Sequence, residues 1–257
     1  MNIVRKRLFD LEFSAVTQTE AVQTILIWAR ENNSSQPKIV VTPNLNITVL
    51  QRKNPAFRDI LNSASLCLVD GRPIYWASRL FKKNLPEVVT GSDLVPAIFS
   101  AYKATPSDKK LKVYLLGAGE GVAQKAALNI TKQYPGIDVC GVYSPPFGFE
   151  HNPLECEKIC RKIKASEASI LVIGLGAPKQ ELWANAHLHK TGVQVALCAG
   201  ATIDFLAGEK PRAPVWMRKV GLEWLFRLST EPRRLAMRYF RDGLALPALI
   251  WTEYRRK

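Results

Sequence analysis

Short, continuous runs of apolar and β-branched residues alternate with longer stretches of helical periodicity along most of this chain. Four runs are clear, a fifth follows near residue 195, and a sixth near residue 140 is weaker. In chain order they are Lys38–Thr42, Leu66–Val69, Val113–Leu116, Asp138–Tyr143, Ile170–Ile173 and Val193–Leu197. Continuous apolar strands suit a parallel sheet that is covered on both faces. The pattern therefore predicts an α/β fold with a Rossmann-like, doubly wound, mainly parallel sheet.

The segments between these runs carry helical patterns. The expected helices are Gln18–Asn32, Pro55–Ala64, Ile74–Leu80, Ser92–Lys103, Gly121–Tyr134, Pro153–Ala165 and Lys179–Lys190. A chain of 257 residues, 47% of them hydrophobic, is long enough to bury one large core. The alternation stops after Gly208, so we expect a core over residues 1–208 and a basic helical appendage over residues 209–257.

Nearly every predicted strand runs into a polar or glycine-rich turn. In a parallel sheet such turns collect at the carboxyl edge, where ligands bind. Asp70 ends one strand directly before Gly71, which suits a general base, although the same carboxylate could cap the next helix. Thr42, Asn44 and Asn46 follow another strand, and their side chains suit either sugar hydroxyls or simple turn formation.

Three further turns carry candidate ligand-binding residues. Gly117 and Gly119 belong to a glycine-rich turn where backbone N–H groups can meet a phosphate. Because Val122 occupies the sixth position of the motif, tight packing or a nucleotide without nicotinamide is favoured over a dinucleotide. Gln180 opens a helix whose N-terminus would favour an oxygen-rich ligand. Asp204 could accept hydrogen bonds from a ribose or a base, or act as a structural cap.

The net charge of +14 suggests an anionic partner. From Glu209 to Lys257, twelve Lys or Arg residues stand against five Asp or Glu residues, with Trp216 and Trp224 among them. Such a surface should meet something anionic and partly apolar; a lipid diphosphate at a membrane fits better than nucleic acid. Leu244–Trp251 is far shorter than the roughly 20 apolar residues that span a bilayer. It suits a segment lying on an anionic membrane, or an ordinary docking helix with a charged tail.

The sequence lacks the residue patterns that are typical of disulfide frameworks, zinc sites and metal-dependent diphosphate sites. An odd number of cysteines without paired C-x-x-C motifs argues against a disulfide framework or a zinc site, and makes the reducing cytoplasm the default compartment. No D-x-D motif occurs, so we expect no metal or other cofactor, and the protein's own cations must offset a leaving diphosphate. Arg227, Arg234, Arg238 and Arg241 are spaced so that one helical face could carry them, although Pro232 interrupts the first step.

Eight segments, taken together and in order, resemble the WecG/TagA/CpsF glycosyltransferase family. They are TPNLN at Thr42–Asn46, VDGRPIYWASRL at Val69–Leu80, LPEVVTGSDL at Leu85–Leu94, YLLGAGEGVAQKAA at Tyr114–Ala127, YSPPFGFE at Tyr143–Glu150, IGLGAPKQELW at Ile173–Trp183, AGATIDFLAG at Ala199–Gly208 and RAPVWMRKVGLEWLFRLSTEPRRLAMRY at Arg212–Tyr239. The chain departs from the family at Val88, where a basic residue is usual, and this leaves the donor sugar open.

The resemblance implies a metal-independent, inverting glycosyltransferase. Such an enzyme moves a hexose or N-acetylhexosamine, by default N-acetylmannosamine, from a UDP-sugar to an undecaprenyl-diphosphate-linked saccharide. By resemblance Asp70 is the catalytic base. The residues expected to hold the sugar, the acceptor or its diphosphate are Thr42, Asn44, Gln180, Arg227, Arg234 and Arg238. The residues expected to hold the nucleotide are Gly117, Gly119, Phe149 and Asp204.

The family also implies a place and partners. The enzyme would be cytoplasmic and peripheral on the inner face of the bacterial plasma membrane, and its copies can self-associate. Two other functions remain open from the residues alone. The turn at Gly117 favours a Rossmann-type NAD-dependent oxidoreductase. The net charge favours a nucleic-acid binder, but that function explains none of the turns at the carboxyl edge, so no nucleic-acid partner is predicted.

Overall fold

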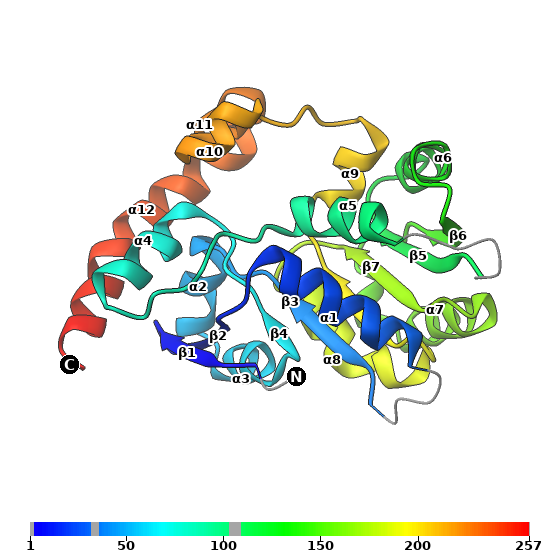
Figure 1. Cartoon of the computed structure of the whole chain (residues 1–257), viewed down its shortest axis with the longest axis horizontal. Helices are drawn as coiled ribbons and strands as arrows, with labels where there is room; N and C mark the ends of the chain where they lie inside the picture. The colour runs from blue at the N-terminus through cyan, green and yellow to red at the C-terminus, as the bar shows by residue number, and fades with distance from the viewer. Residues whose placement is uncertain (1–2, 32–35, 103–108, 257) are drawn as a thin grey trace.

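A six-stranded parallel sheet forms the centre of the protein. The computed structural model describes residues 3–31, 36–102 and 109–256. Its sheet runs in the order β4-β3-β8-β7-β5-β6, and every neighbouring pair is parallel (Figure 1). The strands are β3 (Lys38–Val41), β4 (Leu66–Cys67), β5 (Leu111–Gly117), β6 (Ile137–Tyr143), β7 (Ile170–Gly174) and β8 (Val195–Cys198). All six predicted strands are thus present, and the α/β, doubly wound prediction is confirmed.

Helices cover both faces of this sheet, which explains why its strands are mostly apolar. Successive residues point to opposite faces, so Val40 packs in one hydrophobic cluster and Val41 in the other. One face carries α1 (Gln18–Arg30), α5 (Gly91–Ala101), α6 (Val122–Gln133) and α9 (Thr202–Ala207). The other face carries α2 (Leu45–Arg52), α3 (Pro55–Ser63), α4 (Arg72–Leu80), α7 (Pro153–Ser166) and α8 (Lys179–His187).

The predicted helices are present with shifted ends, and two helices are additional. Asn32 and Lys103, where two predicted helices end, lie outside the described residues. The last predicted helix divides into α8 and a 3-10 turn, η2 (Leu188–Lys190). The sequence did not predict α2 and α9, because their polar openings have the composition of turns. A further short 3-10 turn, η1 (Phe149–His151), follows β6.

A two-stranded antiparallel hairpin near the N-terminus was also not predicted. It pairs β1 (Arg5–Leu8) with β2 (Leu11–Ser14) through Phe9 and Asp10, both of which have positive φ. Tight hairpin turns with this geometry usually carry Asn or Gly, which adopt positive φ at little cost. Here the turn is held by tertiary contacts: Phe9 is buried against Phe81, and its N–H donates to Glu253 Oε2 at 3.0 Å.

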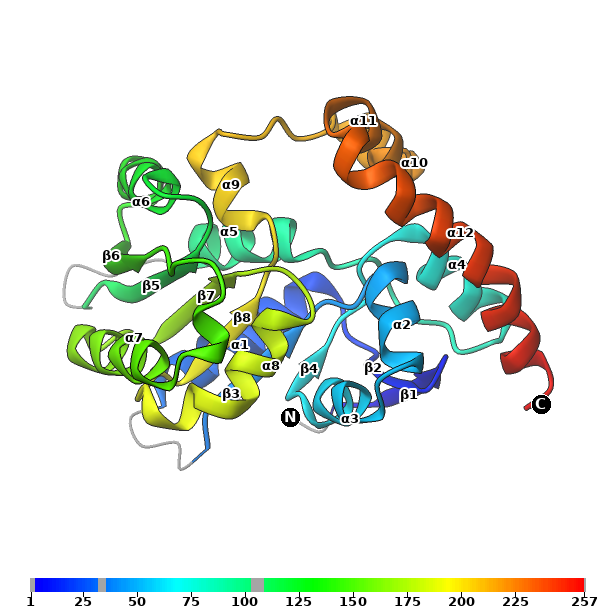
Figure 2. The same ribbon diagram turned by 180° about the vertical axis from the view of Figure 1, so that it is seen from behind.

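The basic C-terminal segment forms three helices that pack along one side of the core. They are α10 (Val215–Val220), α11 (Glu223–Thr230) and α12 (Pro232–Tyr254), and α12 runs beside α2 and α4 (Figures 1 and 2). Leu249 of α12 is buried in the main core cluster. The division into a core over residues 1–208 and an appendage over residues 209–257 stays a prediction, although the second part lies against the first.

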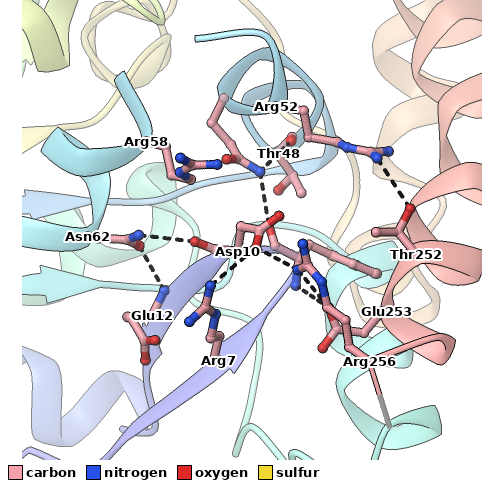
Figure 3. A network of polar contacts seen from close by, with 12 residues as sticks. Arg7, Asp10, Glu12, Thr48, Arg52, Arg58, Asn62, Thr252, Glu253 and Arg256 are labelled. Atoms are coloured by element: carbon pink, nitrogen blue, oxygen red, sulfur yellow. Dashed lines mark hydrogen bonds and ion pairs between the residues drawn. The ribbon is translucent and has the colours of Figure 1, made fainter. Parts of the chain in front are cut away.

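The far end of α12 is anchored to the N-terminal hairpin. Figure 3 shows Arg256 directed to Asp10 and Glu253 close to the hairpin turn; Arg256 Nη1 lies 2.5 Å from Asp10 Oδ1. Thr252 Oγ1 accepts from Arg52 Nη2 of α2 at 3.2 Å. Partial burial alone would raise the pKa of Asp10, but the hydrogen bonds and charges of Arg256 and Arg7 hold this pKa below its usual range. These contacts fix how α12 lies across the core.

Candidate active site

A cavity of about 670 Å³ lies between the core and the C-terminal helices. From the core, Asn44, Asp70 and Asp93 line it; from the C-terminal helices, Arg227 and Arg238 do so. Neither part of the chain forms this cavity alone. Its size is typical of sites for small molecules.

Asp70 reaches the cavity because the chain continues alongside β3 after β4 ends. The N–H groups of Leu68 and Asp70 donate to the carbonyl oxygens of Val41 and Pro43 at 2.8 and 3.1 Å. Helix α4 then begins after Gly71, whose φ of +101° is rare for other residues. No side chain caps α4. The alternative that Asp70 serves as a helix cap is therefore not what the structure shows.

Asn44 orients the carboxylate of Asp70. Its side-chain oxygen accepts from the Ile47 N–H at 3.2 Å and so caps α2. The cap occupies the oxygen, which leaves the amide NH₂ of Asn44 to donate to Asp70, and this hydrogen bond favours the ionised carboxylate. One asparagine thus starts a helix and positions the candidate base.

The surroundings of Asp70 suit proton transfer near neutral pH. Burial, followed by the nearby carboxylate of Glu223, raises its pKa to about 7, while Arg227 and the bond from Asn44 oppose the rise. A general base works best when its pKa lies near the working pH. Asp70 is therefore poised to accept a proton from a hydroxyl group in the cavity.

Replacing Glu223 with Gln should move the acid limb of the pH–kcat/KM profile. In the wild type this limb should lie near pH 7, because activity rises as Asp70 ionises. Without the like charge the pKa of Asp70 falls, so the limb should move to lower pH. Arg227→Gln removes an opposite charge and should move it to higher pH. Limbs that stay in place in both variants would show that Asp70 does not govern the profile.

Arg227 and Arg238 present guanidinium groups with unused donors. The Nε atoms of both are buried, and neither has a hydrogen-bond acceptor within the described part of the chain. Leaving a buried charged donor unpaired is costly, so such groups are typical of sites that await an anionic ligand. Arg227 also lies over the ring of Phe205 at 5.9 Å, which connects the cavity to α9.

Asp93 was not singled out from the sequence, yet it ties the core to the C-terminal segment. Its Oδ1 accepts from Arg212 Nη2 at 2.9 Å and from Arg218 Nη1 at 2.7 Å. Thr90, at the start of α5, also bonds the Asp93 side chain. The Thr90-x-x-Asp93 spacing is a helix-start signal, but it carries no information about two arginines more than a hundred residues away.

The remaining residues predicted to hold sugar or acceptor lie elsewhere. Arg234 is half exposed and pairs with Glu231 at 2.6 Å, outside the cavity wall. Thr42 is buried after β3. Gln180 is also buried: its Nε2 donates to Glu181 at 2.8 Å and its Oε1 accepts from the Gly200 N–H at 3.2 Å. Gln180 thus shapes the turn after β8 and does not line the cavity.

The predicted nucleotide residues follow three strands at the carboxyl edge, also outside the cavity wall. The Ser144 hydroxyl donates to the carbonyl oxygens of Gly117 and Gly119 at 3.3 and 3.1 Å. A Cβ at Gly117 would lie 2.5 Å from the Gly174 oxygen, so close packing explains this glycine. Phe149 is buried in η1. Asp204 on α9 pairs with Lys210 at 3.6 Å.

Within the ranges that the structure describes, no cluster of three or more His, Cys, Asp or Glu side chains is arranged to hold a metal ion.

Val88, which stands where a basic residue was expected by resemblance, lines the cavity. Among the described residues, the cations in the cavity wall are Arg72 from the core and Arg218, Arg227 and Arg238 from the C-terminal helices, and the charge of Arg227 lowers the pKa of Asp70.

A carboxylate facing cationic groups at the carboxyl edge of a Rossmann-like sheet defines an enzyme that acts on an anionic substrate. The sequence model of the family described as "Glycosyl transferase WecG/TagA/CpsF family" matches residues 6–257, and the chain belongs to this family. The protein is thus a glycosyltransferase, as its sequence segments predicted. Its family membership gives no support to the oxidoreductase or nucleic-acid alternatives.

Curated relatives from Staphylococcus aureus are similar over most of their length. Those of strains NCTC 8325 / PS 47 and COL are each 27% identical over 236 residues, which cover 91% of this chain and 88% of the relative. The relative of strain MRSA252 is 26% identical over the same share. All three are named N-acetylglucosaminyldiphosphoundecaprenol N-acetyl-beta-D-mannosaminyltransferase.

Proposed function

We propose that this protein transfers a hexose or N-acetylhexosamine from a UDP-sugar to an undecaprenyl-diphosphate-linked saccharide. N-acetylmannosamine is the default donor sugar, because the similar Staphylococcus aureus proteins are named for its transfer. The observation that carries the proposal is the cavity in which a base with a pKa near 7 faces two arginines, each with a buried Nε atom that has no acceptor among the described residues. A sugar acceptor needs the base, and a diphosphate needs the cations.

The reaction is a single displacement. Asp70 removes the proton from the acceptor hydroxyl as its oxygen attacks the anomeric carbon, on the face opposite the UDP. The bond to the UDP oxygen breaks, and negative charge grows on the diphosphate. Arg227 and Arg238 stabilise that charge, and such preorganised groups usually supply the largest electrostatic contribution. Inversion at the anomeric carbon follows from one displacement.

The nucleotide would bind along the carboxyl edge, beside the diphosphate. Arg227 lies over Phe205, the neighbour of Asp204, and Lys210 links Asp204 to Glu231 at the start of α12. Contacts of this kind support a path from a uridine near Asp204 to a diphosphate near Arg227. Gly117, Gly119 and Phe149 stay predictions for the nucleotide, and Thr42, Gln180 and Arg234 for the sugar or acceptor.

Release of UDP tests the proposed function. The purified protein is mixed with one UDP-hexose at a time and a short-chain lipid diphosphate that carries N-acetylglucosamine. We expect UDP release that requires the acceptor and is fastest with one donor, by default UDP-N-acetylmannosamine. Val88 makes the survey of donors necessary. Failure of every UDP-hexose and UDP-N-acetylhexosamine to release UDP in the presence of the acceptor would refute the function.

A peripheral position on the inner face of the plasma membrane fits the outer surface of α12. No helix of the described residues is long and apolar enough to cross a membrane. Met237, Phe240, Leu244, Trp251 and Tyr254 are between 56% and 65% exposed, and their spacing of three, four, seven and three residues puts them on one face. Arg233, Arg241 and Arg255 are exposed on the same helix or at its end. An apolar face with basic neighbours is typical of helices at anionic membranes.

Substituting Phe240 and Leu244 with Ser should weaken association with anionic vesicles. Losing two apolar side chains from a bilayer interface should lower the partition coefficient roughly 10–100-fold. Raising the salt concentration should weaken wild-type association further, because the arginines contribute charge attraction. Leu154→Gln changes an apolar residue on α7 that is also mostly exposed, and it serves as the control. Equal co-sedimentation of the wild type, the double variant and the control with vesicles would refute the assignment of this face of α12 to the membrane.

Self-association of the chain stays a prediction.

A further inference from the structure

A second cavity, of about 730 Å³, lies beside the first one, between the end of α4 and the second half of α12. Leu80 and Phe81 line it on one side, and Leu246, Pro247, Ile250 and Trp251 on the other. None of the described residues in its wall is charged. We call this cavity the α4–α12 groove. Its apolar walls are suited to a hydrocarbon chain and not to a sugar or a phosphate.

The groove is continuous with the active-site cavity. Gly243 and Leu246 belong to the walls of both. On α12, Arg238, Leu246 and Ile250 are separated by eight and four residues, which places them along one face in that order. A ligand with its charged part near Arg238 can therefore continue along this helix into the groove.

Gly243 lies where the two cavities meet, and no neighbouring atom among the described residues is close enough to require a glycine at this position. It lies inside α12, where glycine is less favourable than alanine. A Cβ built there would meet no atom within 4 Å. The bare backbone thus borders open space at the point where the two cavities meet, which keeps the passage between them wide.

We propose that the α4–α12 groove holds the first isoprene units of the acceptor's polyprenyl chain. This inference rests on the proposed function, since it takes the acceptor to be a polyprenyl diphosphate. From Gly243 to Tyr254 the helix extends about 16 Å, so the groove holds only the start of a long chain. Leu80, Trp251 and Tyr254 are more than half exposed at its rim, and the rest of the chain leaves there.

The continuity of the two cavities favours the acceptor's chain over an acyl chain of a bilayer lipid. A bilayer lipid in the groove would gain nothing from its connection to Asp70 and Arg238. A chain attached to a diphosphate-linked sugar needs an apolar path beginning next to a cation and a base, and the shared wall at Gly243 supplies it. The groove would therefore make the enzyme prefer acceptors with longer isoprenoid chains.

The test compares two synthetic acceptors in detergent micelles. Both carry N-acetylglucosamine on a diphosphate; one has two isoprene units and the other has seven. We expect wild-type kcat/KM to be higher for the long acceptor. Leu80→Gln, at a side chain that is 61% exposed in the free protein, should lower the long-to-short ratio of kcat/KM by ~10-fold, because the chain loses one leucine-sized apolar contact. Gly243→Leu should lower this ratio by a similar factor, because the added side chain fills the passage between the two cavities. Leu128→Gln, 65% exposed on α6, is the matched control and should keep the wild-type ratio.

Three outcomes would overturn the inference. The first is a ratio that stays at its wild-type value in both groove variants, with thermal melting confirming that they are folded. The second comes from presenting the same two acceptors in vesicles. A long-to-short ratio that the groove variants lower in vesicles but not in micelles would assign these residues to bilayer contact. The third is a wild-type enzyme that transfers sugar to neither acceptor; this refutes the proposed function, and the groove assignment with it.

Discussion

Replacing Asp70 with Asn should lower kcat by about 10²–10⁴. The substitution preserves the shape of the side chain and its contact with Asn44, but removes the group that accepts the proton. Burial and Glu223 raise the pKa of the Asp70 carboxyl group to about 7, so it can accept a proton near neutral pH. The amide oxygen of Asn is far too weak a base to do this. Single-turnover transfer from the UDP-sugar to the lipid acceptor measures the loss directly.

The stability of the same variant provides a control with a defined sign. An aspartate ordinarily has a pKa of 3.8, whereas Asp70 stays protonated in the folded protein up to about pH 7. Between these values the unfolded chain gains free energy from ionisation that the folded chain does not, so Asp70 lowers stability as pH rises. Asp70→Asn should therefore melt at the same or a higher temperature at pH 8. Near-normal turnover, with UDP binding intact, would rule out Asp70 as the base.

Arg227→Ala and Arg238→Ala should each lower kcat/KM by about 10²–10³. This is the usual effect of removing one donor that stabilises transition-state charge. The buried Nε atoms of both arginines lack acceptors within the described residues, so a diphosphate would complete the hydrogen bonding of these guanidinium groups. Steady-state kinetics with the UDP-sugar and a short-chain acceptor provide the measurement. The effect should appear in kcat as well as in KM, because the charge grows in the transition state.

Arg234→Ala separates the structural account from the family resemblance. Arg234 is half exposed, pairs with Glu231 and does not line the cavity, so the geometry predicts activity close to wild type. The resemblance predicts a loss comparable to that of Arg238→Ala. Full activity in Arg227→Ala and Arg238→Ala together with a large loss in Arg234→Ala would contradict the arrangement described above.

The sheet could be predicted because its strands carry their own signal. Each of the six runs is mostly apolar, as burial on both faces favours, and all six became parallel strands. The hairpin carried no such signal: Phe9 and Asp10 adopt positive φ only because Phe81 and Glu253 hold the turn from elsewhere in the chain. Tertiary contacts of that kind leave no local pattern.

The candidate site was predictable at its centre and less so at its periphery. Asp70 and Asn44 follow strands that lie side by side in the sheet, so their meeting follows from topology. Arg227 and Arg238 could be nominated by charge and resemblance, but Arg234, four residues before Arg238, points to Glu231 instead. Asp93 and Glu223 affect the site through partners distant in sequence. Periodicity cannot say which arginine of a helix faces a cavity on another element.

A structure of the enzyme bound to UDP and a short-chain acceptor would test the central claim most directly. The claim is that the C-terminal helices bring Arg227 and Arg238, and the core brings Asp70, to one reaction centre. We expect the UDP diphosphate within ion-pair distance of Arg227 or Arg238, and the acceptor hydroxyl about 3 Å from the Asp70 carboxylate. A diphosphate beyond the reach of both arginines, or an acceptor hydroxyl directed away from Asp70, would contradict it.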